Sequence, residues 1–498
     1  MSMEPLLRIK GITKTFAGTK ALDHVDIDIY PGEIHALLGE NGAGKSTLIK
    51  ILCGIYDCSE GSLTYKGEEI GLDVKRLSLS VIHQDLGLVD DMSVAENIAL
   101  TAGYKKRGSF ISWKESRRQA VDLLKKMDCD INPDAKVSAL SSAEKSMVAI
   151  SRALAQKTDI LILDEPTATL PQKDVDKLFQ VLHRLKEEGI AIIYVTHRLD
   201  EIFEISQKIT VLRNGKLVKT SYTKDVTSEQ LVFDIIGKNV QDVFSRIEGT
   251  LTDKVLLKVD KMDTTFVGPV SFEVRQGEIL ALFGLRGSGH HEVGRCLWGL
   301  EPLDGGKIYL DGKEISIKNS ATAIKYGFGF VSSKRREEGM AASFSVRENI
   351  YINPSVNGHG MWKFMNLREE QKKCDDIIDK FSIKTSGREA PIGTLSGGNQ
   401  QKAMVARWFE ANSRIMIFEE PTIGVDIGAK ADIYHLINLS LKEGKAVILI
   451  SSDYEEVSMI AHRAIVFDRG GVIGEVPKEK MSKTYLSGLA TGAIEISQ

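Results

Sequence analysis

Short runs of apolar residues alternate along this chain with longer, charged segments whose apolar positions recur at helical spacing. The apolar run Ile160–Leu163 is followed by the charged segment Asp174–Glu188 and then by the apolar run Ile190–Val195. Strands that alternate with helices in this way are typical of a parallel sheet flanked by helices. The segments Lys114–Cys129 and Asn366–Phe381 each predict a further, exposed helix. We therefore expect an α/β fold.

This pattern occurs twice along the chain. The stretch Pro31–Gly39 returns as Gln276–Gly284, and Ser93–Ile98 returns as Ser345–Ile350. The period is about half the chain, which is far longer than the repeats of solenoid proteins. The sequence therefore predicts two copies of one domain.

The boundary between the two copies is predicted near Gly237–Lys254, where polar and charged residues interrupt the pattern. A new strand is expected directly afterwards, at Val255–Val259. The predicted domains are residues 1–245 and 246–498.

Composition limits the class of protein further. Of the 498 residues, 27% are charged and 42% hydrophobic, which is typical of a globular protein, and the net charge of −3 gives no footprint for nucleic acid. No apolar run approaches the roughly 20 residues that cross a bilayer, and Met1–Lys10 has no signal-like apolar run. The five scattered cysteines include no Cys-x-x-Cys pair, so neither disulfides nor a zinc site is indicated. We expect a cytoplasmic protein whose membrane role, if any, depends on a partner.

The clearest chemical signal is a glycine-rich stretch that fits the phosphate-loop pattern at each fixed position and follows the apolar run Ile34–Leu38. Its glycines let backbone N–H groups turn toward an anion, and the next helix adds partial positive charge. Lys45 is expected to reach the outer phosphates, and the Ser46 hydroxyl to bind Mg²⁺. The predicted nucleotide-binding residues here are Gly39, Glu40, Asn41, Gly42, Ala43, Gly44, Lys45, Ser46 and Thr47.

Polar residues also stand at the ends of other predicted strands in the first half. Asp164 and Glu165 follow one strand directly, which predicts a carboxylate that holds Mg²⁺ and a second that polarises the attacking water. Gln84 and His197 each follow a further strand. Either of these two, taken alone, is more often a surface or structural residue, so their interpretation depends on the order of all the motifs.

That order, with Gln84, a Leu-Ser motif, Asp164-Glu165 and His197 after the phosphate loop, resembles the ATP-binding-cassette family in both halves of the chain. The resemblance implies two tandem P-loop NTPase domains, each with a mainly parallel sheet, an antiparallel β subdomain and a helical subdomain. It implies that Gln84 senses the γ-phosphate, helps to bind Mg²⁺ and faces the transmembrane partner. It also implies that His197 contacts the γ-phosphate. Phe16 would stack on adenine, although an aromatic residue near a strand is more often part of the core.

In this family two cassettes pair head to tail, so that each ATP lies between the phosphate loop of one and the Leu-Ser-Gly-Gly signature of the other. The resemblance therefore implies that residues of the second half complete the first site. These are Ser396, Gly397, Gly398, Asn399 and Asp426. ATP and Mg²⁺ are the cofactors expected there.

The second site departs from the pattern on both sides. His290 and His291 replace the lysine and the Mg²⁺-binding hydroxyl, and the opposing signature Leu140–Glu144 lacks both glycines and adds an acid. Glu419 stands in place of the aspartate, and Ser452 in place of the histidine of the first half. We expect one turnover site per chain. A metal site at the paired histidines is the weaker alternative, because adjacent residues rarely converge on one ion.

The stretches Gly39–Thr47 and Leu395–Lys402 resemble the ATP-binding subunits of bacterial monosaccharide importers, of the ribose, galactose and xylose type. Departures at His290-His291, Ser333-Lys334 and Thr167–Pro171 put the exact subtype in doubt. The resemblance implies that ATP hydrolysis energises sugar import through a membrane permease. A periplasmic or lipid-anchored sugar-binding protein would act through that permease, and this chain would lie on the cytoplasmic face of the membrane.

Other functions remain open at this point. Related importers of nucleosides use similar tandem chains, and the sequence does not identify the sugar. A soluble tandem-cassette factor that acts on ribosomes would usually keep both phosphate loops and join its halves by a long, charged helical linker, and this chain has neither feature. A regulatory protein that binds ATP without hydrolysis is disfavoured by Glu165 and His197 beside a full phosphate loop.

Overall fold

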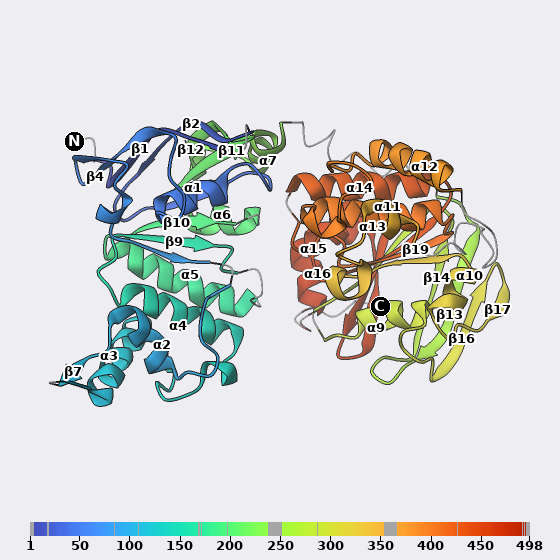
Figure 1. Cartoon of the computed structure of the whole chain (residues 1–498). Helices are drawn as coiled ribbons and strands as arrows, with labels where there is room; N and C mark the ends of the chain where they lie inside the picture. The colour runs from blue at the N-terminus through green and yellow to red at the C-terminus, as the bar shows by residue number, and fades with distance from the viewer. Residues whose placement is uncertain are drawn as a thin grey trace. The chain divides into compact units, whose positions relative to one another are not determined.

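The computed structural model divides the chain into two compact units, Met1–Asn239 and Val240–Gln498 (Figure 1). It describes residues 4–16, 19–83, 85–107, 109–167, 170, 172–196, 198–237, 251–285, 287–352, 366–425, 427–490, 492 and 494. The boundary predicted between residues 245 and 246 lies outside the described residues and stays a prediction. Each unit has its own mixed sheet, its own antiparallel sheet and its own helices.

The main sheet of the first unit has six strands in the order β12-β11-β3-β10-β9-β6. All neighbours pair in parallel except β11 and β12, which pair antiparallel at the edge. The strands are β3 (Ile34–Leu38), β6 (Leu79–Ile82), β9 (Ile160–Asp164), β10 (Ala191–Val195), β11 (Lys208–Arg213) and β12 (Lys216–Tyr222). In the register of β10, Val195 lies opposite Asp164 on one side and Leu37 on the other, so the carboxyl ends of three strands meet.

Successive residues of the central strands belong to different cores. In β9, Ile160 and Ile162 join one apolar cluster, whereas Leu161 and Leu163 join another, because side chains alternate between the two faces of a sheet. The first cluster includes α1 (Lys45–Leu52) and the antiparallel sheet β2-β1-β4-β5. That sheet contains β1 (Leu7–Phe16), β2 (Thr19–Ile29), β4 (Glu60–Tyr65) and β5 (Glu68–Gly71).

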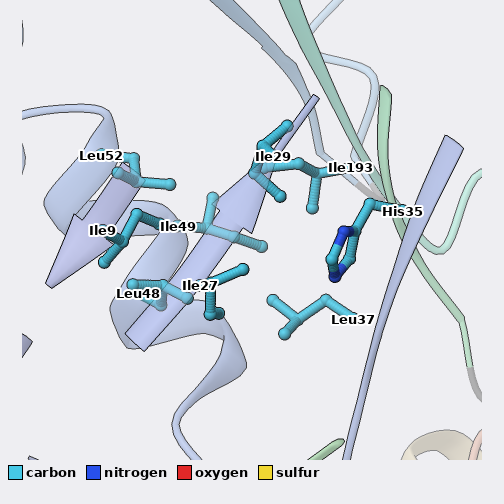
Figure 2. Close-up of a pocket in the computed structure, with 9 residues that line it drawn as sticks. All are labelled: Ile9, Ile27, Ile29, His35, Leu37, Leu48, Ile49, Leu52 and Ile193. Carbon is cyan, nitrogen blue, oxygen red and sulfur yellow. The ribbon is translucent and has the colours of Figure 1, made fainter. Parts of the chain in front are cut away.

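A small cavity lies between α1 and strands β1, β2, β3 and β10 of the first unit, and its lining is apolar except for one histidine (Figure 2). Its volume is about 10 Å³, which is at most the space of one water molecule and far too small for a nucleotide. The residues around it are Ile9, Ile27, Ile29, His35, Leu37, Leu48, Ile49, Leu52 and Ile193.

The helices of the unit that follow α1 are α2 (Val94–Ala102), α3 (Trp113–Lys126), α4 (Ser142–Leu154), α5 (Gln172–Glu187), α6 (Leu199–Ile205) and α7 (Ser228–Ile236). The second apolar cluster of this unit contains residues of α2, α3, α4, α5 and α6 but none of α7. A short hairpin, β7 (Lys106–Arg107) and β8 (Phe110–Ile111), precedes α3. The helices predicted at Lys114–Cys129 and Asp174–Glu188 are confirmed as α3 and α5.

The second unit repeats this plan. Its main sheet has the order β18-β19-β20-β15-β21-β22, with β21 and β22 antiparallel and the other neighbours parallel, and its antiparallel sheet has the order β14-β13-β16-β17. The strands are β13 (Val255–Asp263), β14 (Val270–Arg275), β15 (Ile279–Gly284), β16 (Gly305–Leu310), β17 (Lys313–Ile315), β18 (Phe328–Val331), β19 (Ile415–Glu419), β20 (Ala446–Ser451), β21 (Arg463–Asp468) and β22 (Gly471–Pro477). The prediction of two domains with the same α/β fold is confirmed.

The helices of the second unit pack against one continuous apolar core. They are α9 (His290–Trp298), α10 (Ser320–Lys325), α11 (Val346–Ile350), α12 (Leu367–Lys380), α13 (Gly397–Glu410), α14 (Ile427–Lys442), α15 (Tyr454–Ile460) and α16 (Lys483–Ala490). The predicted helix Asn366–Phe381 is confirmed as α12. Within the described ranges of both units, every helix is too short or too polar to span a bilayer.

Candidate active site

The first phosphate loop connects β3 to α1 through a backbone that only glycine adopts easily. Gly39, Gly42 and Gly44 all have positive φ, of 149°, 86° and 107°. A Cβ added to Gly39 would lie 2.3 Å from the carbonyl oxygen of Leu212, and one added to Gly44 would lie 2.8 Å from that of Ala21. Side chains are therefore excluded at both ends of the loop, which explains the glycines in structural terms.

Lys45 is the first residue of α1, and its side chain folds back over the loop. The Nζ atom donates to the carbonyl oxygens of Gly39, at 2.5 Å, and Glu40, at 3.0 Å. The first turn of α1 contains no acidic residue. The ammonium group therefore adds to the partial positive charge of the helix N-terminus, where anions bind.

Asp164 ends β9 close to this loop. Burial raises the pKa of its carboxyl group, the neighbouring charge of Glu165 adds to that rise, and Lys45 lies near enough to oppose it. The charge of Lys45 thus acts on Asp164. That the two residues share MgATP stays a prediction.

Glu165 has a left-handed backbone, with φ of 51°. Its N–H donates to the carbonyl oxygen of Val195 at the end of β10, at 2.8 Å. Glu420 repeats this arrangement in the second unit, with φ of 43° and an N–H bond of 2.8 Å to Ile450. A non-glycine residue in this region costs about 1–2 kcal/mol, and such strain is often found at functional sites.

Sequence reasoning missed a buried carboxylate that organises the surroundings of Glu165. Oε2 of Glu201 accepts hydrogen bonds from Thr167 at 2.9 Å, from Tyr194 at 2.8 Å and from Thr196 at 3.1 Å. Arg198 Nη1 lies 3.1 Å from the other oxygen. Glu201 is on α6, so this network connects that helix to the segment after Glu165 and to both neighbours of residue 197. No sequence motif marks it, because its members come from separate segments.

Several predicted residues cannot be placed. Gln84, His197 and Asp426 lie outside the described residues, so their roles stay predictions. Phe16 is described and is 40% exposed, with its ring edge-on to that of Tyr56 at 5.2 Å. The alternative that Phe16 belongs to the core is wrong, and its stacking on adenine stays a prediction.

The signature of the second unit forms the N-terminus of α13. Ser396 is the N-cap, and its hydroxyl accepts a hydrogen bond of 2.8 Å from the Asn399 side chain. Gly398 packs so closely that an added Cβ would lie 2.5 Å from the Cβ of Ala429. The first turn contains no acidic residue. This helix end therefore has the electrostatics of an anion site.

The corresponding helix N-terminus in the first unit, that of α4, is already capped by a carboxylate side chain of the same helix. Ser141 and Glu144 form a capping box in which Oε2 of Glu144 accepts from the Ser141 backbone at 2.8 Å and from its hydroxyl at 2.7 Å. These hydrogen bonds lower the pKa of the Glu144 carboxyl group. An ionised carboxylate thus caps α4, and it would repel a phosphate placed at the same point.

The second phosphate loop leads from β15 into α9, whose first residue is His290. This side chain is completely buried, and its Nδ1 lies 2.8 Å from the Ser288 hydroxyl. Burial lowers the pKa of His290 to about 3, so the ring is neutral at physiological pH. The position that carries the Lys45 ammonium in the first loop is uncharged in the second.

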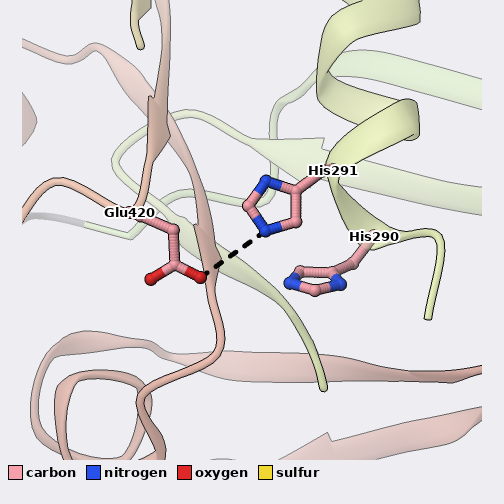
Figure 3. A group of neighbouring side chains, drawn as sticks. All are labelled: His290, His291 and Glu420. Atoms are coloured by element: carbon pink, nitrogen blue, oxygen red, sulfur yellow. Dashed lines mark ion pairs between the residues drawn. The ribbon is translucent and has the colours of Figure 1, made fainter. Parts of the chain in front are cut away.

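His291 carries the positive charge of this region instead. Its Nδ1 lies 3.2 Å from Oε1 of Glu419, and its Nε2 lies 3.5 Å from Oε1 of Glu420 (Figure 3). Burial opposes the charge on the ring, but the interactions with the two glutamates outweigh it and raise the pKa to about 9.

Glu419, at the position of the Mg²⁺-binding aspartate, is completely buried and fully engaged with protein groups. Arg295 donates to it through Nε at 2.8 Å and Nη2 at 3.0 Å, and the Ser333 hydroxyl donates at 2.7 Å. Although burial alone would raise the pKa of Glu419, the bonds from His291, Arg295 and Ser333 hold it below its usual range. His291 and Arg295 are four residues apart on α9, a spacing that indicates one shared helix face.

The sequence profile of the ABC transporter family matches residues 22–168 and 267–423, one match in each unit. The chain belongs to the ABC transporter family. Its two units are therefore cassettes, and the predicted resemblance is confirmed for both halves of the chain.

Full-length relatives of this cassette protein are known. It is 39% identical to "Ribose import ATP-binding protein RbsA" of Caldanaerobacter subterraneus subsp. tengcongensis, over 98% of this chain and 100% of that protein. It is also 39% identical to "Putative ribose/galactose/methyl galactoside import ATP-binding protein" of Geobacillus kaustophilus, over 99% of both. A solved complex of archaeal ribosomal stalk protein aP1 and archaeal ribosome recycling factor aABCE1 matches 96% of this chain and 92% of that chain, with a TM-score of 0.62. At 17% identity, this last likeness concerns the fold alone.

Proposed function

We propose that this chain is the ATP-hydrolysing subunit of a monosaccharide importer of the ribose, galactose and xylose class. The observation that carries the proposal is the match to sugar-import ATP-binding proteins over essentially the whole of both chains. The chain would act on a membrane permease from the cytoplasmic face, and a sugar-binding protein would deliver the pentose or hexose to that permease.

Hydrolysis would take place at the first phosphate loop. Lys45 would hold the outer phosphates of ATP, while Ser46, Asp164 and Gln84 would hold Mg²⁺, which neutralises charge on the phosphate oxygens. Glu165 would orient the attacking water and accept its proton, and His197 would contact the γ-phosphate. The bond from the Glu165 backbone N–H to Val195 supports this role, because it holds the main chain of Glu165 at the end of β10, next to Asp164 in sequence.

The second cassette would complete this site from the opposite side. Ser396, Gly397, Gly398 and Asn399 would meet the γ-phosphate at the N-terminus of α13, and Asp426 would lie nearby. The absence of an acid in the first turn of α13 supports this assignment. Closure of the cassettes around ATP, and their separation after hydrolysis, would move the permease.

The second composite site would bind nucleotide poorly and would not hydrolyse it. Neutral His290 provides no charge for the phosphates, Glu419 is engaged by Arg295, and Glu144 places an anion on the opposing signature. The first removes the positive charge that holds the phosphates, the second occupies the carboxylate that would bind Mg²⁺, and the third repels the γ-phosphate. We therefore infer one turnover site per chain.

Copurification followed by reconstitution tests the transport function. A tagged chain, extracted in mild detergent from membranes of its native host, should retain a polytopic permease that mass spectrometry identifies. ATP hydrolysis by the reconstituted complex should rise when a sugar-loaded binding protein is added. Recovery of ribosomal proteins without a permease would contradict the proposal.

Matched glutamine variants test the assignment of a single site. Glu165→Gln should abolish hydrolysis and trap one ATP per chain, whereas Glu420→Gln, the equivalent change in the second cassette, should leave turnover largely intact. Nucleotide released from quenched samples gives the stoichiometry. Two trapped ATP molecules per chain, or equal loss of activity in both variants, would refute the assignment.

A further inference from the structure

We propose that His290, His291 and Glu420 form a binding site for a divalent transition-metal ion, best matched by Zn²⁺ (Figure 3). One potential ligand atom from each residue lies within 4.8 Å of the others. Adjacent residues seldom share an ion, but here the two imidazole rings lie together, with centroids 4.3 Å apart and planes tilted by 59°.

His290 has a nitrogen atom that the protein leaves without a partner. Its Nδ1 is engaged by the Ser288 hydroxyl, at 2.8 Å. Its Nε2 is buried and has no hydrogen-bond partner among the described residues. Buried polar atoms are nearly always satisfied, so an orphaned imidazole nitrogen requires an explanation. Figure 3 shows a nitrogen of this ring directed to the side where Glu420 lies, and a metal ion there would use its lone pair.

The groups behind the proposed ligands hold them as metal ligands are usually held. Histidine ligands commonly give their second nitrogen to a carboxylate or another polar group, which fixes the tautomer and the ring orientation. Nδ1 of His291 lies 3.2 Å from Glu419, and Nε2 then faces Glu420. Oε1 of Glu420 also accepts from the backbone N–H of Ser452, at 2.8 Å. The ring of His291 and the carboxylate of Glu420 are therefore each held by a protein group that is not a proposed ligand.

Two imidazole nitrogens and one carboxylate oxygen form a ligand set that Zn²⁺ uses with a fourth, open position. Mg²⁺ and Ca²⁺ prefer oxygen ligands, so a transition metal is favoured. Two tetrahedral ligands at about 2.1 Å from one ion are about 3.4 Å apart. His291 Nε2 and Glu420 Oε1 are 3.5 Å apart, close to that value, and a ligand atom of His290 lies within 4.8 Å of one atom of each of the other two residues. Glu419 is already paired with Arg295, so Glu420 is the carboxylate that remains for the ion.

A protonated His291 that merely bridges the two glutamates is the competing interpretation. It would explain the contacts of His291, but it gives no role to the buried Nε2 of His290. Metal binding by the folded chain distinguishes the two states.

The test measures Zn²⁺ binding by the full-length chain without an affinity tag and without nucleotide. Equilibrium dialysis of chelator-treated protein should give one Zn²⁺ ion bound per chain. Its binding should depend on the proposed ligands in the second unit. Glu420→Gln, which keeps the shape of the side chain, should weaken binding by at least about 10-fold, and His291→Asn should do the same. Glu165→Gln is the matched control. It changes the equivalent glutamate of the first unit, where Lys45 and Ser46 stand in place of the two histidines, and it should bind Zn²⁺ like the wild type.

Thermal unfolding separates loss of the site from loss of the fold. Zn²⁺ should raise the unfolding midpoint of the second unit in the wild type and in Glu165→Gln, but not in Glu420→Gln. Failure of the wild type to retain Zn²⁺, or equal Zn²⁺ affinity in the wild type and Glu420→Gln, would overturn the proposal. Because no ATP or sugar enters the experiment, its failure would leave the transport function untouched.

Discussion

Replacement of Arg295 by methionine should destabilise the second unit by about 3 kcal/mol. Arg295 makes two hydrogen bonds to Glu419, of 2.8 and 3.0 Å, and Glu419 is completely buried. Removal of one partner from a buried ion pair typically costs about 3–5 kcal/mol, because the other charge stays behind without compensation. We take the lower end, since His291 and Ser333 would still contact the carboxylate.

Urea unfolding followed by tryptophan fluorescence measures this change in a Trp113→Phe background, because Trp113 lies on α3 of the first unit and would otherwise add to the signal. Trp298 lies on α9, the helix of Arg295, and its ring is 5.1 Å from that of Trp408. Both rings therefore report on the unfolding of the second unit. Lys307→Met is the control, because it breaks an equally short pair with Glu314 whose side chains are each about half exposed. Such a surface pair contributes about 0–1 kcal/mol.

The double variant Arg295→Met with Glu419→Gln should recover much of the lost stability, because the stranded charge is gone. The pH dependence provides a further check. Since the network holds the pKa of Glu419 below its ordinary value of 4.5, its contribution is complete above about pH 5 and declines as the pH falls below 4.5. The cost of Arg295→Met should therefore shrink in acid. A cost no greater than that of Lys307→Met at pH 7 would refute the reasoning.

Three further changes test other parts of the structure. Lys45→Met should lower ATP affinity by about 10- to 100-fold, since a charge-assisted bond contributes about 1.5–3 kcal/mol; unchanged affinity in a nucleotide titration would contradict its role. Gly39→Ala should lower the melting temperature more than Gly42→Ala, because only the first Cβ would clash, at 2.3 Å from Leu212, whereas the second meets nothing within 4 Å. Equal melting of the two variants would count against the clash. Burial raises the pKa of Glu456 to about 8, so the second unit should lose stability as the pH rises from about 4.5 to 8. Glu456→Gln should remove this slope, and a slope that persists in urea titrations would assign it to another group.

The fold could be predicted well because its signals are local. The predicted strand Ile34–Leu38 coincides with β3, and Val255, the predicted start of the first strand of the second copy, is where β13 begins. A short apolar run between turn residues is consistent with a buried strand, and the length of these runs favours a strand over a helix. The phosphate loop is equally visible in the sequence, since its glycines and Lys45 all lie within the short stretch Gly39–Lys45.

The network around Glu419 could not be predicted. Its donors come from α9 and from the segment after β18, whereas Glu419 itself ends β19, and no local pattern connects these segments. Glu201 was missed for the same reason. The capping box of Ser141 and Glu144 was visible in sequence as Ser-x-x-Glu, yet only the structure showed the serine hydroxyl turned toward the acid. Gln84, His197 and Asp426 stay predictions.

The left-handed turn shared by Glu165 and Glu420 has a consequence for the history of the chain. The two domains share this unusual main-chain geometry, although the lysine and hydroxyl of the first loop are replaced by histidines in the second. At this point the two units differ in the side chains of the loop and not in the region of their backbone angle. Restoring a nucleotide site in the second cassette is therefore a matter of a few substitutions on an existing scaffold, and a laboratory lineage that reverts them stepwise would retrace the path by which the two halves parted.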